Sequence, residues 1–470
     1  MSKTGRQFAL LAVVSALLGF VGYGPVANRQ GPATTIQVEG GDVAKGRGPG
    51  KAGPSADGPT VVATEGVAPS RPGLECAAGR NGGPTGDPGV SATEIKLAAT
   101  VVTDGPAKSL LEPSTAGMKA VIDRVNAKGG ICGRRLSLTV ANDSFDAAKG
   151  QQYIRNFIAE DYFALAVVPS SEGLSAAISS GDIDRAGIPV VGTNGMRIEQ
   201  YQSPWVWPVA TATVSTMRVM ATSGARERNA KTFAIVWDGK YKFGVEGATA
   251  FKKQVEAFGG RIVADVRLDP EQPSYSTEVA AFNEKCGGGK CDMVALLLLP
   301  DTATKWMEKK PAMGKRYTAG AQTLFTDEFA NSCVRSALER CHGMAVWTGY
   351  LPPIGRYAGL PDIERYVDDV STVRPGIDVR NQFLEGAYLG MELLMDALRR
   401  VGPDLTRARL KQVLDSATFR YDLTSPLSWT PARRSANIRA RSFAMVVSNG
   451  GFRGWGDENS GWVADPAGGA

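Results

Sequence analysis

From residue 90 onward the sequence alternates short apolar segments with amphipathic segments, and this rhythm restricts the fold more than any other feature. It predicts strands at residues 95–102, 136–141, 163–168 and 188–191, with helices at 112–128, 147–158 and 174–185 between them. In the first helix the apolar residues recur at helical spacing. Strands that alternate with helices favour parallel sheets covered on both faces, so the predicted fold class is α/β and doubly wound.

The same rhythm restarts after Pro208, with helices expected at 213–228, 245–258, 275–284 and from 302, and strands at 232–237, 261–268, 293–299 and 317–321. Two such sets predict two similar lobes with a cleft between them. Ligands of these folds bind outside the carboxyl ends of the strands. A later strand at 345–348, helices at 361–370, 381–400 and 406–417 and a strand at 442–447 return to the lobes, so several chain crossings form a hinge.

The first 30 residues resemble an export segment. Lys3 and Arg6 precede an apolar run at 8–21, which suits a secretory signal and is short for a spanning helix of about 20 residues. Residues 1–30 are therefore a signal peptide or an uncleaved membrane anchor. Residues 31–89 are rich in Gly and Pro and predict a flexible tether. The protein is expected to be extracytoplasmic, either secreted or tethered to the outer face of the cytoplasmic membrane.

Six cysteines in an exported chain suggest three disulfides. Cys286 and Cys291 flank a flexible Gly-rich spacer, and Cys333 and Cys341 bracket one short segment. Elimination then pairs Cys76 with Cys132. The alternative is free buried thiols, and the spacings of a zinc site are absent.

The composition excludes several classes of function. A single histidine, His342, rules out His-rich metal sites and limits catalytic triads to arrangements around that residue. The formal net charge is +6, from 53 basic and 47 acidic residues, with no basic run interleaved with aromatics. Nucleic-acid binding is therefore unsupported. We expect no metal and no cofactor.

One stretch resembles a known family. Residues 115–136, Thr-Ala-Gly-Met-Lys-Ala-Val-Ile-Asp-Arg-Val-Asn-Ala-Lys-Gly-Gly-Ile-Cys-Gly-Arg-Arg-Leu, are similar to the first helix and following turn of the solute-binding proteins of bacterial ABC importers, of the leucine/isoleucine/valine-binding type. These are type I periplasmic binding proteins. Further similar pieces are Gly105-Pro106, Asn142-Asp143, residues 168–171, residues 187–191 and Phe243-Gly244.

The resemblance implies an N-lobe of residues 90–210 plus 344–422 and a C-lobe of residues 211–343 plus 423–463. It also implies that the protein is not an enzyme. It would capture a small polar ligand, such as an amino acid, an amide or a small organic acid, and deliver it to an ABC permease. We expect a monomer whose lobes close on the ligand.

Ser170 and Ser171 are the first candidate ligand-binding residues, because they follow a buried strand at the start of a helix. Their hydroxyls and the free backbone N–H groups there suit a carboxylate, and helix capping is the alternative. Thr193 and Asn194 follow the next strand and resemble the second ligand-contacting loop of the family. Their alternative is an ordinary turn, since Asn-Gly favours turns.

Further candidates in the C-lobe follow its predicted strands: Tyr241, Phe243, Asp301, Gln322 and Thr323. Many relatives carry Tyr-Gly where this chain has Phe243-Gly244. Relatives that bind amino acids often carry an acid for the ammonium group near Gln322, where this chain has an amide. In the first loop, Leu110 stands where many relatives have an aromatic residue. These departures weaken the assignment of amino acids as ligands.

Two rival functions remain. A ligand sensor with the same fold, held at the membrane by an uncleaved N-terminal segment, would signal to a partner protein. An exported enzyme on this scaffold would depend on paired carboxylates such as Asp301 and Asp327, since fold does not exclude chemistry.

Overall fold

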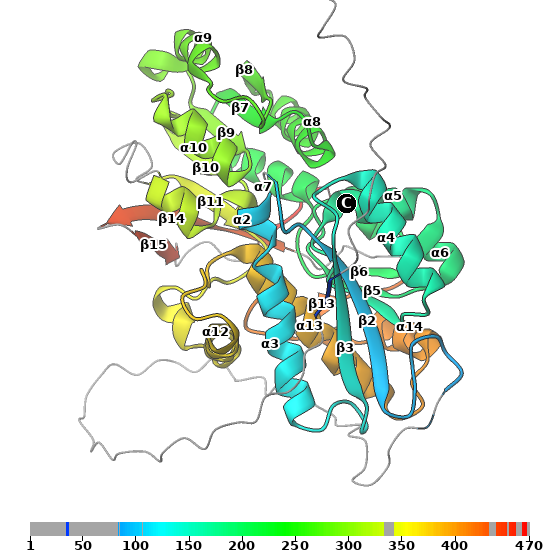
Figure 1. The fold of residues 1–470 in the computed structure, drawn as a ribbon. Helices are drawn as coiled ribbons and strands as arrows, with labels where there is room; N and C mark the ends of the chain where they lie inside the picture. The colour runs from blue at the N-terminus through cyan, green and yellow to red at the C-terminus, as the bar shows by residue number, and fades with distance from the viewer. Residues whose placement is uncertain are drawn as a thin grey trace, which may run out of the picture. The chain divides into compact units, whose positions relative to one another are not determined.

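The structure is a computed structural model that describes residues 34–36, 83, 85–105, 107–332, 343–431, 439–448, 451–456 and 463–467. Contacts divide the chain after Ala33, and every described element lies in the unit Thr34–Ala470. Two separate sheets, each covered by helices, organise this unit (Figure 1). Among the described helices, none is both long enough and apolar enough to cross a membrane.

The first sheet has the strand order β1-β3-β2-β4-β5-β6. Its parallel strands are β2 (Glu94–Val101), β3 (Arg135–Asn142), β4 (Ala164–Ala166), β5 (Val190–Thr193) and β6 (Val206–Pro208). The short strand β1 (Thr34–Ile36) adds to the edge, antiparallel to β3. The four strands predicted in this part of the chain are confirmed, although β4 is shorter than predicted.

The second sheet has the order β15-β14-β11-β10-β9-β7-β8. Its parallel strands are β7 (Thr232–Asp238), β8 (Arg261–Leu268), β9 (Met293–Leu297), β10 (Tyr317–Gly320) and β11 (Ala345–Thr348). The antiparallel strands β14 (Arg439–Ser448) and β15 (Gly451–Gly456) complete one edge. The predicted α/β fold with two parallel sheets is therefore confirmed.

Helices cover both faces of each sheet (Figure 1). One face of the first sheet carries α4 (Ala147–Ala159), α5 (Ser171–Ser179) and α6 (Asp182–Ala186), and the other carries α3 (Ser114–Ala127) and α13 (Gln382–Val401). Helix α12 (Pro361–Val373) packs against α3. Helix α14 (Arg407–Ser416) packs against α13. On the second sheet, α7 (Thr213–Arg226) and α8 (Lys242–Ala257) lie opposite α9 (Ser276–Cys286) and α10 (Pro300–Glu308). We use N-lobe and C-lobe for the first and second sheets with these helices.

The chain crosses between the sheets more than once. After β6 it enters the C-lobe through residues 209–212, and after β11 it returns to the helices of the N-lobe. Because β11 pairs with β10 and β14, this return follows Thr348, later than the predicted boundary at residue 344. The crossing segments place residues 209–211 and 349–350 beside both lobes.

The helix predicted at 174–185 is two helices in the structure. Helix α5 starts at Ser171 and ends at Ser179, and α6 begins at Asp182. Gly181 lies between them with a left-handed backbone (φ 75°), a conformation that interrupts a right-handed helix. The apolar spacing continues through this break, so the sequence pattern alone predicts one helix.

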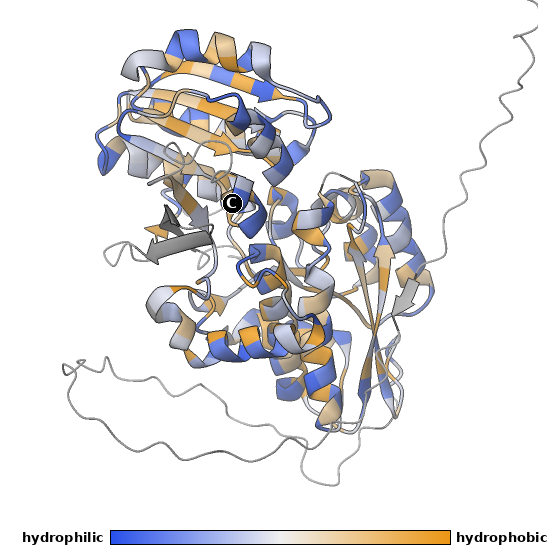
Figure 2. Ribbon diagram, turned by 60° about the vertical axis from the view of Figure 1, so that its left-hand side comes forward, coloured by the Kyte–Doolittle hydropathy of each residue, from blue (hydrophilic) through white to orange (hydrophobic). Residues whose placement is uncertain are grey.

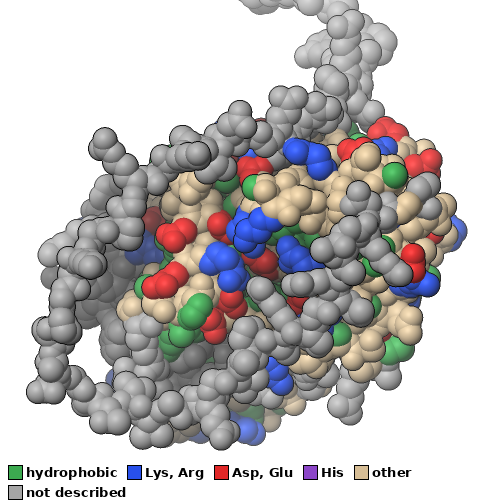
Figure 3. Space-filling model, turned by 90° about the horizontal axis from the view of Figure 1, so that it is seen from below, with side chains coloured by type: hydrophobic (Ala, Val, Ile, Leu, Met, Phe, Trp, Pro, Cys, Tyr) green, Lys and Arg blue, Asp and Glu red, His purple; other side chains and the backbone are tan. Residues whose placement is uncertain are grey.

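The apolar residues of the strands form the core of each lobe (Figure 2). Strands β4 and β9 are buried along their whole length, as expected for parallel strands covered on both faces. On the face of the molecule shown in Figure 3, Lys and Arg side chains are interspersed with Asp and Glu. The described part of that face therefore carries both signs of charge, which agrees with the small net charge.

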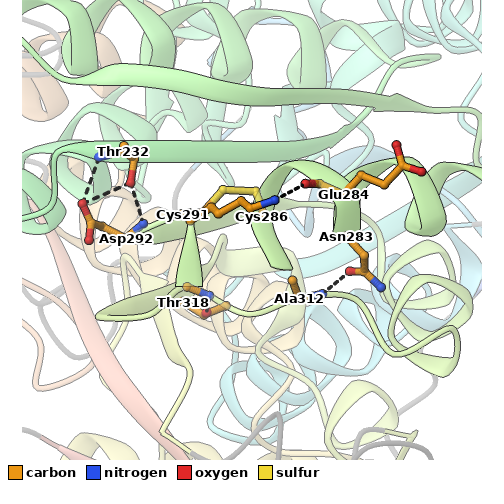
Figure 4. Close-up of a disulfide and its surroundings, with 10 residues drawn as sticks. Thr232, Asn283, Glu284, Cys286, Cys291, Asp292, Ala312 and Thr318 are labelled. Carbon is orange, nitrogen blue, oxygen red and sulfur yellow. Dashed lines mark hydrogen bonds between the residues drawn. A yellow bond between two sulfur atoms is a disulfide. The ribbon is translucent and has the colours of Figure 1, made fainter. Parts of the chain in front are cut away.

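The predicted disulfide between Cys286 and Cys291 is present, and it joins the end of α9 to the start of β9 (Figure 4). Next to it, Asp292 and Thr232 exchange hydrogen bonds that tie β9 to β7. Cys132 is disulfide-bonded as well, and its predicted partner Cys76 lies outside the described residues. The predicted Cys333–Cys341 pair also lies outside them.

Candidate functional site

Strand β4 ends in a strained turn that brings the start of α5 to the cleft between the lobes. Val167 and Val168 have positive φ angles of 68° and 35°, and the Val168 N–H donates to the Ala166 carbonyl at 2.8 Å. Branched side chains rarely adopt this conformation, which costs about 1–3 kcal/mol for each residue. The turn shortens β4 relative to its apolar run and directs Pro169 and Ser171 toward a cavity. Strain of this kind is typical of functional sites.

An apolar cavity with about 270 Å³ of empty space, its mouth included, lies between the two lobes. The N-lobe side is lined by Ala107, Leu110, Leu111, Phe145, Pro169, Ser171 and Met196. The C-lobe contributes Phe243, Leu299 and Thr323, and Phe383 comes from α13. Aromatic and aliphatic side chains predominate, with only two hydroxyl-bearing residues among them.

A polar cavity with about 210 Å³ of empty space adjoins it, because Met196 and Phe383 line both. Its other lining residues are Asn194, Ala210, Thr211, Gln322, Gly349, Tyr350 and Gln382. The Tyr350 hydroxyl donates to Asn194 Oδ1 at 3.1 Å, and Thr348 donates to Gln382 Oε1 at 3.1 Å. Three buried polar atoms here have no hydrogen-bond partner among the described residues: Asn194 Nδ2, Thr211 Oγ1 and Gln322 Oε1.

Five of the nine residues predicted from the sequence line these cavities. Ser171, Phe243 and Thr323 line the apolar cavity, and Asn194 and Gln322 line the polar cavity. They come from both lobes, and they lie in the segments that follow β4, β5, β7 and β10, as expected for the carboxyl ends of parallel strands. The Thr323 hydroxyl itself donates to the Leu298 carbonyl at 2.6 Å.

The other four predicted residues do not line either cavity. Ser170 is fully buried. Its side chain makes no capping hydrogen bond to α5, so the structure does not support the helix-capping alternative. Thr193 donates to Gln200 at 2.6 Å. The ring of Tyr241 packs against Phe145 and Phe243, with ring centres 4.9 and 5.9 Å away, so it supports the cavity wall from behind.

Asp301 is the clearest departure from the prediction. It stands in the first turn of α10, pairs with Lys305 at 2.8 Å, and keeps 51% of its side chain exposed. The first turn of α10 begins at Pro300, so only Leu299 of this loop reaches the cavity. A carboxylate in the first turn is stabilised by the helix dipole and needs no ligand.

Several lining residues were not predicted, namely Leu111, Phe145, Met196, Thr211, Tyr350, Gln382 and Phe383. Thr211 and Tyr350 belong to the crossing segments, which the sequence identified only as a hinge. Gln382 and Phe383 are the first residues of α13. The sequence marks this helix start with a capping asparagine, because Asn381 Oδ1 accepts from the N–H groups of Phe383 and Leu384. Nothing in the local sequence tells which cavity that helix start faces.

A buried ionic cluster joins the lobes beside the apolar cavity. Arg197, only 2% exposed, binds Glu172 at 3.0 Å and Glu199 at 2.8 Å in the N-lobe, and Glu246 of α8 at 3.3 Å in the C-lobe. Lys242 of α8 reaches back to Glu199 at 2.5 Å. We call these five residues the Arg197 cluster. Burial raises the pKa of Glu172 and Glu246 above the usual value for glutamate, because their ionised forms lose water.

Two buried carboxyl groups stand at strand ends next to the cavities. Burial raises the pKa of Asp143 to about 6 and that of Asp238 to about 7. Asp238 Oδ2 accepts from the Leu299 N–H at 2.6 Å, so it fixes the loop that carries Leu299 into the apolar cavity. Asp143 Oδ1 accepts from the Phe145 N–H at 3.0 Å and holds the turn of another lining residue. Both carboxyl groups therefore hold in place a backbone segment that carries a cavity-lining residue.

The paired carboxylates of the enzyme alternative are not assembled. Asp301 pairs with Lys305, whereas Asp327 pairs with Arg380 and donates its N–H to Asp378, and neither aspartate lines a cavity. Within the described residues no group of three or more His, Cys, Asp or Glu side chains is placed to hold a metal ion.

Comparisons with known proteins point to one family. The model of the periplasmic binding protein family matches residues 94–451. Family members are binding proteins rather than enzymes, and they are extracytoplasmic. A comparison with curated proteins finds no match.

Solved structures share the fold at low sequence identity. A fatty acid ABC transporter substrate-binding protein from Thermomonospora curvata is 18% identical, with a TM-score of 0.66, over 82% of this chain and 98% of its own. A branched-chain amino acid transporter substrate-binding protein from Streptococcus pneumoniae, in complex with isoleucine, is 14% identical, with a TM-score of 0.63. The match covers 79% of this chain and 100% of that protein. An ABC transporter solute-binding protein from Rhodopseudomonas palustris, in complex with 3,4-dihydroxybenzoic acid, is 15% identical, with a TM-score of 0.65. The match covers 80% of this chain and 99% of that protein.

Proposed function

The chain belongs to the periplasmic binding protein family, and from that premise we propose that it captures a small molecule between its lobes for delivery to an ABC importer. The observation that carries this proposal is a pair of adjoining cavities lined from both lobes and from the crossing segments. A ligand that contacts both lobes favours the closed arrangement, which is how such a protein distinguishes its loaded from its empty form.

The finer parts of the proposal follow from the family and the sequence. The permease partner, the monomeric state and the absence of catalytic activity in this chain are proposals. So is the attachment of the body to a signal peptide or anchor at 1–30, although the predicted tether at 31–89 contributes strand β1 to the first sheet. If residues 1–30 stay on the mature protein, the membrane-anchored sensor gains support over the secreted form.

The lining also bears on the choice among amino acids, amides and organic acids. The three solved relatives above bind ligands named as a fatty acid, isoleucine and a dihydroxybenzoic acid, all of which carry an apolar body. The apolar cavity of this chain suits a body of that kind. A very polar ligand such as a sugar would leave its hydroxyl groups without partners there.

The test is a thermal-shift screen of the full chain, produced under oxidising conditions, against amino acids, amides, organic acids and sugars. A ligand at a hundred times its dissociation constant stabilises the folded state by about 2.7 kcal/mol, which raises the melting temperature by a few degrees. Phe243→Ala removes a wall of the apolar cavity and should weaken binding roughly ten- to a hundredfold.

Val245→Ala is the matched control, because Val245 lies on the same helix and is 42% exposed. It should leave the affinity unchanged. A cooperatively folded protein that no compound stabilises would contradict the proposed function, and an equal loss of affinity in both variants would contradict the proposed site.

A further inference from the structure

The described residues that line the two cavities include no charged side chain. The charged residues that adjoin lining residues in the sequence are Lys108, Glu112, Asp146, Glu172, Arg197 and Lys242; none of them lines a cavity, and the last three belong to the Arg197 cluster. An ionised ligand group in such an enclosed site would lose its water without gaining a counter-charge, which is unfavourable. A zwitterionic amino acid would meet this penalty twice.

The polar cavity nevertheless has unused hydrogen-bonding capacity. Asn194 Nδ2 is a donor, Gln322 Oε1 is an acceptor, and Thr211 Oγ1 can serve as either, and all three are buried without partners among the described residues. Buried polar atoms are normally paired, so three unpaired atoms in one cavity indicate a ligand group that completes them. The partners of the two side-chain amides set which atom of each faces the cavity, because the Tyr350 hydroxyl donates to Asn194 Oδ1 and Gln322 Nε2 donates to Met196 Sδ at 3.1 Å.

A head group that fits this set must accept and donate hydrogen bonds at the same time while carrying no charge. A carboxamide does both, because its oxygen accepts from Asn194 and Thr211 while its NH2 group donates to Gln322. A carboxylate offers only acceptors and would leave Gln322 Oε1 facing another acceptor. An ammonium group offers only donors and would find no carboxylate.

The shared lining residues Met196 and Phe383 place the two cavities side by side, so one ligand can occupy both. Its other end would lie among Leu110, Leu111 and Phe243. The space free of protein atoms is limited in both cavities, so the ligand is small.

We propose that the ligand is a small uncharged amphipathic molecule, with a carboxamide-type head in the polar cavity and an apolar body in the apolar cavity. This inference rests on the proposed function and specifies the chemical class of its ligand.

The experiment measures the affinity of the full chain, by calorimetry at pH 7, for matched compounds that differ only in the head group. The sets are benzamide, benzoate and benzylamine; phenylacetamide, phenylacetate and L-phenylalanine; and hexanamide and hexanoate. The amide of at least one set should bind at least tenfold more tightly than its ionised partners.

Tighter or equal binding of the ionised partners would overturn the inference and leave the proposed function standing, with the N-terminus of α5 as the anion site instead. Binding of none of these compounds, and of none in the thermal-shift screen, would contradict the proposed function itself.

Two variants test whether the head group of the ligand lies in the polar cavity. Thr211→Val keeps the shape and removes the hydroxyl, so it should weaken amide binding about fivefold or more. Gln322→Glu puts a carboxylate in the polar cavity and should reverse the preference, so that benzylamine binds more tightly than benzamide.

The control is Thr249→Val, since Thr249 is exposed on α8 and its hydroxyl donates only to the Val245 carbonyl. It should have no effect on any affinity. Unchanged amide affinity in Thr211→Val, with an unchanged melting temperature, would show that the head group lies elsewhere and would overturn the inference.

Discussion

At the scale of single residues, Asp238 links the stability of the protein to pH. It is fully buried at the end of β7, and burial raises its pKa to about 7. The folded state therefore holds a proton that the unfolded state releases near pH 4. The stabilisation from this proton is complete below about pH 3.8 and is lost as the pH rises through 7.

Asp238→Asn should consequently remove part of the pH dependence of stability. Relative to the wild type, the variant should gain as much as about 4 kcal/mol in its free energy of unfolding between pH 4 and pH 8, because it never holds a buried charge. Urea unfolding across this range measures the effect. Asp368→Asn, at an exposed position on α12, is the control. Parallel stability curves for Asp238→Asn and the wild type would contradict the assignment.

At the scale of elements, the position of α13 decides whether the site exists. Gly390 on this helix faces Gly192 on β5, and a Cβ atom at Gly390 would lie 2.4 Å from the Gly192 carbonyl oxygen. Only backbone atoms fill this contact, so no side chain can rotate away. The close approach places the first turn of α13, with Gln382 and Phe383, at both cavities.

Gly390→Ala should therefore push α13 away from the sheet. We expect a loss of about 1–3 kcal/mol of stability from overpacking, together with weaker ligand binding. Urea unfolding and ligand titration measure the two effects. Gly287→Ala is the control, because a Cβ atom there meets nothing within 4 Å and the backbone has an ordinary φ of −60°. Equal stability of both variants would exclude a role for this contact.

At the scale of the whole molecule, the Arg197 cluster connects the lobes. Its members Glu246 and Lys242 belong to α8 of the C-lobe, whereas Arg197, Glu172 and Glu199 belong to the N-lobe. The Arg197–Glu246 and Lys242–Glu199 pairs join the two lobes and can exist only while the lobes are together, so they favour the closed arrangement independently of the ligand. A larger fraction of closed protein raises the apparent affinity of a ligand that binds this form.

Glu246→Gln should shift the lobes toward the open arrangement by about 1 kcal/mol, which weakens ligand binding roughly fivefold. Small-angle scattering of the ligand-free protein should report a larger radius of gyration, and calorimetry should report the lower affinity. Glu256→Gln, at an exposed position on the same helix, should change neither. Unchanged affinity in Glu246→Gln would mean that the cluster contributes nothing to closure.

The sequence by itself determined the local elements and their order. The alternation of apolar and amphipathic segments predicted most strands of both sheets, although it missed β1, β6 and β15, and for β8 and β11 even the bounds agree with the structure. Periodicity predicts a helix or strand because each segment must bury one or both of its faces, and the apolar residues that form a buried face lie within the segment itself. The candidate residues after β4, β5 and β10 were found for a related reason, since the carboxyl ends of parallel strands share one edge.

Only the tertiary structure decided which side chains meet at that edge. Asp301 follows a strand as predicted, yet it turns to Lys305 and solvent. Thr211 and Tyr350 come from chain crossings, and Phe383 from a helix start, and these join the cavities because of how α13 and the two sheets pack. Contacts between segments distant in sequence depend on packing across elements, which no local pattern encodes. The sequence therefore fixes the strands and helices, whereas packing between the lobes fixes the composition of the site.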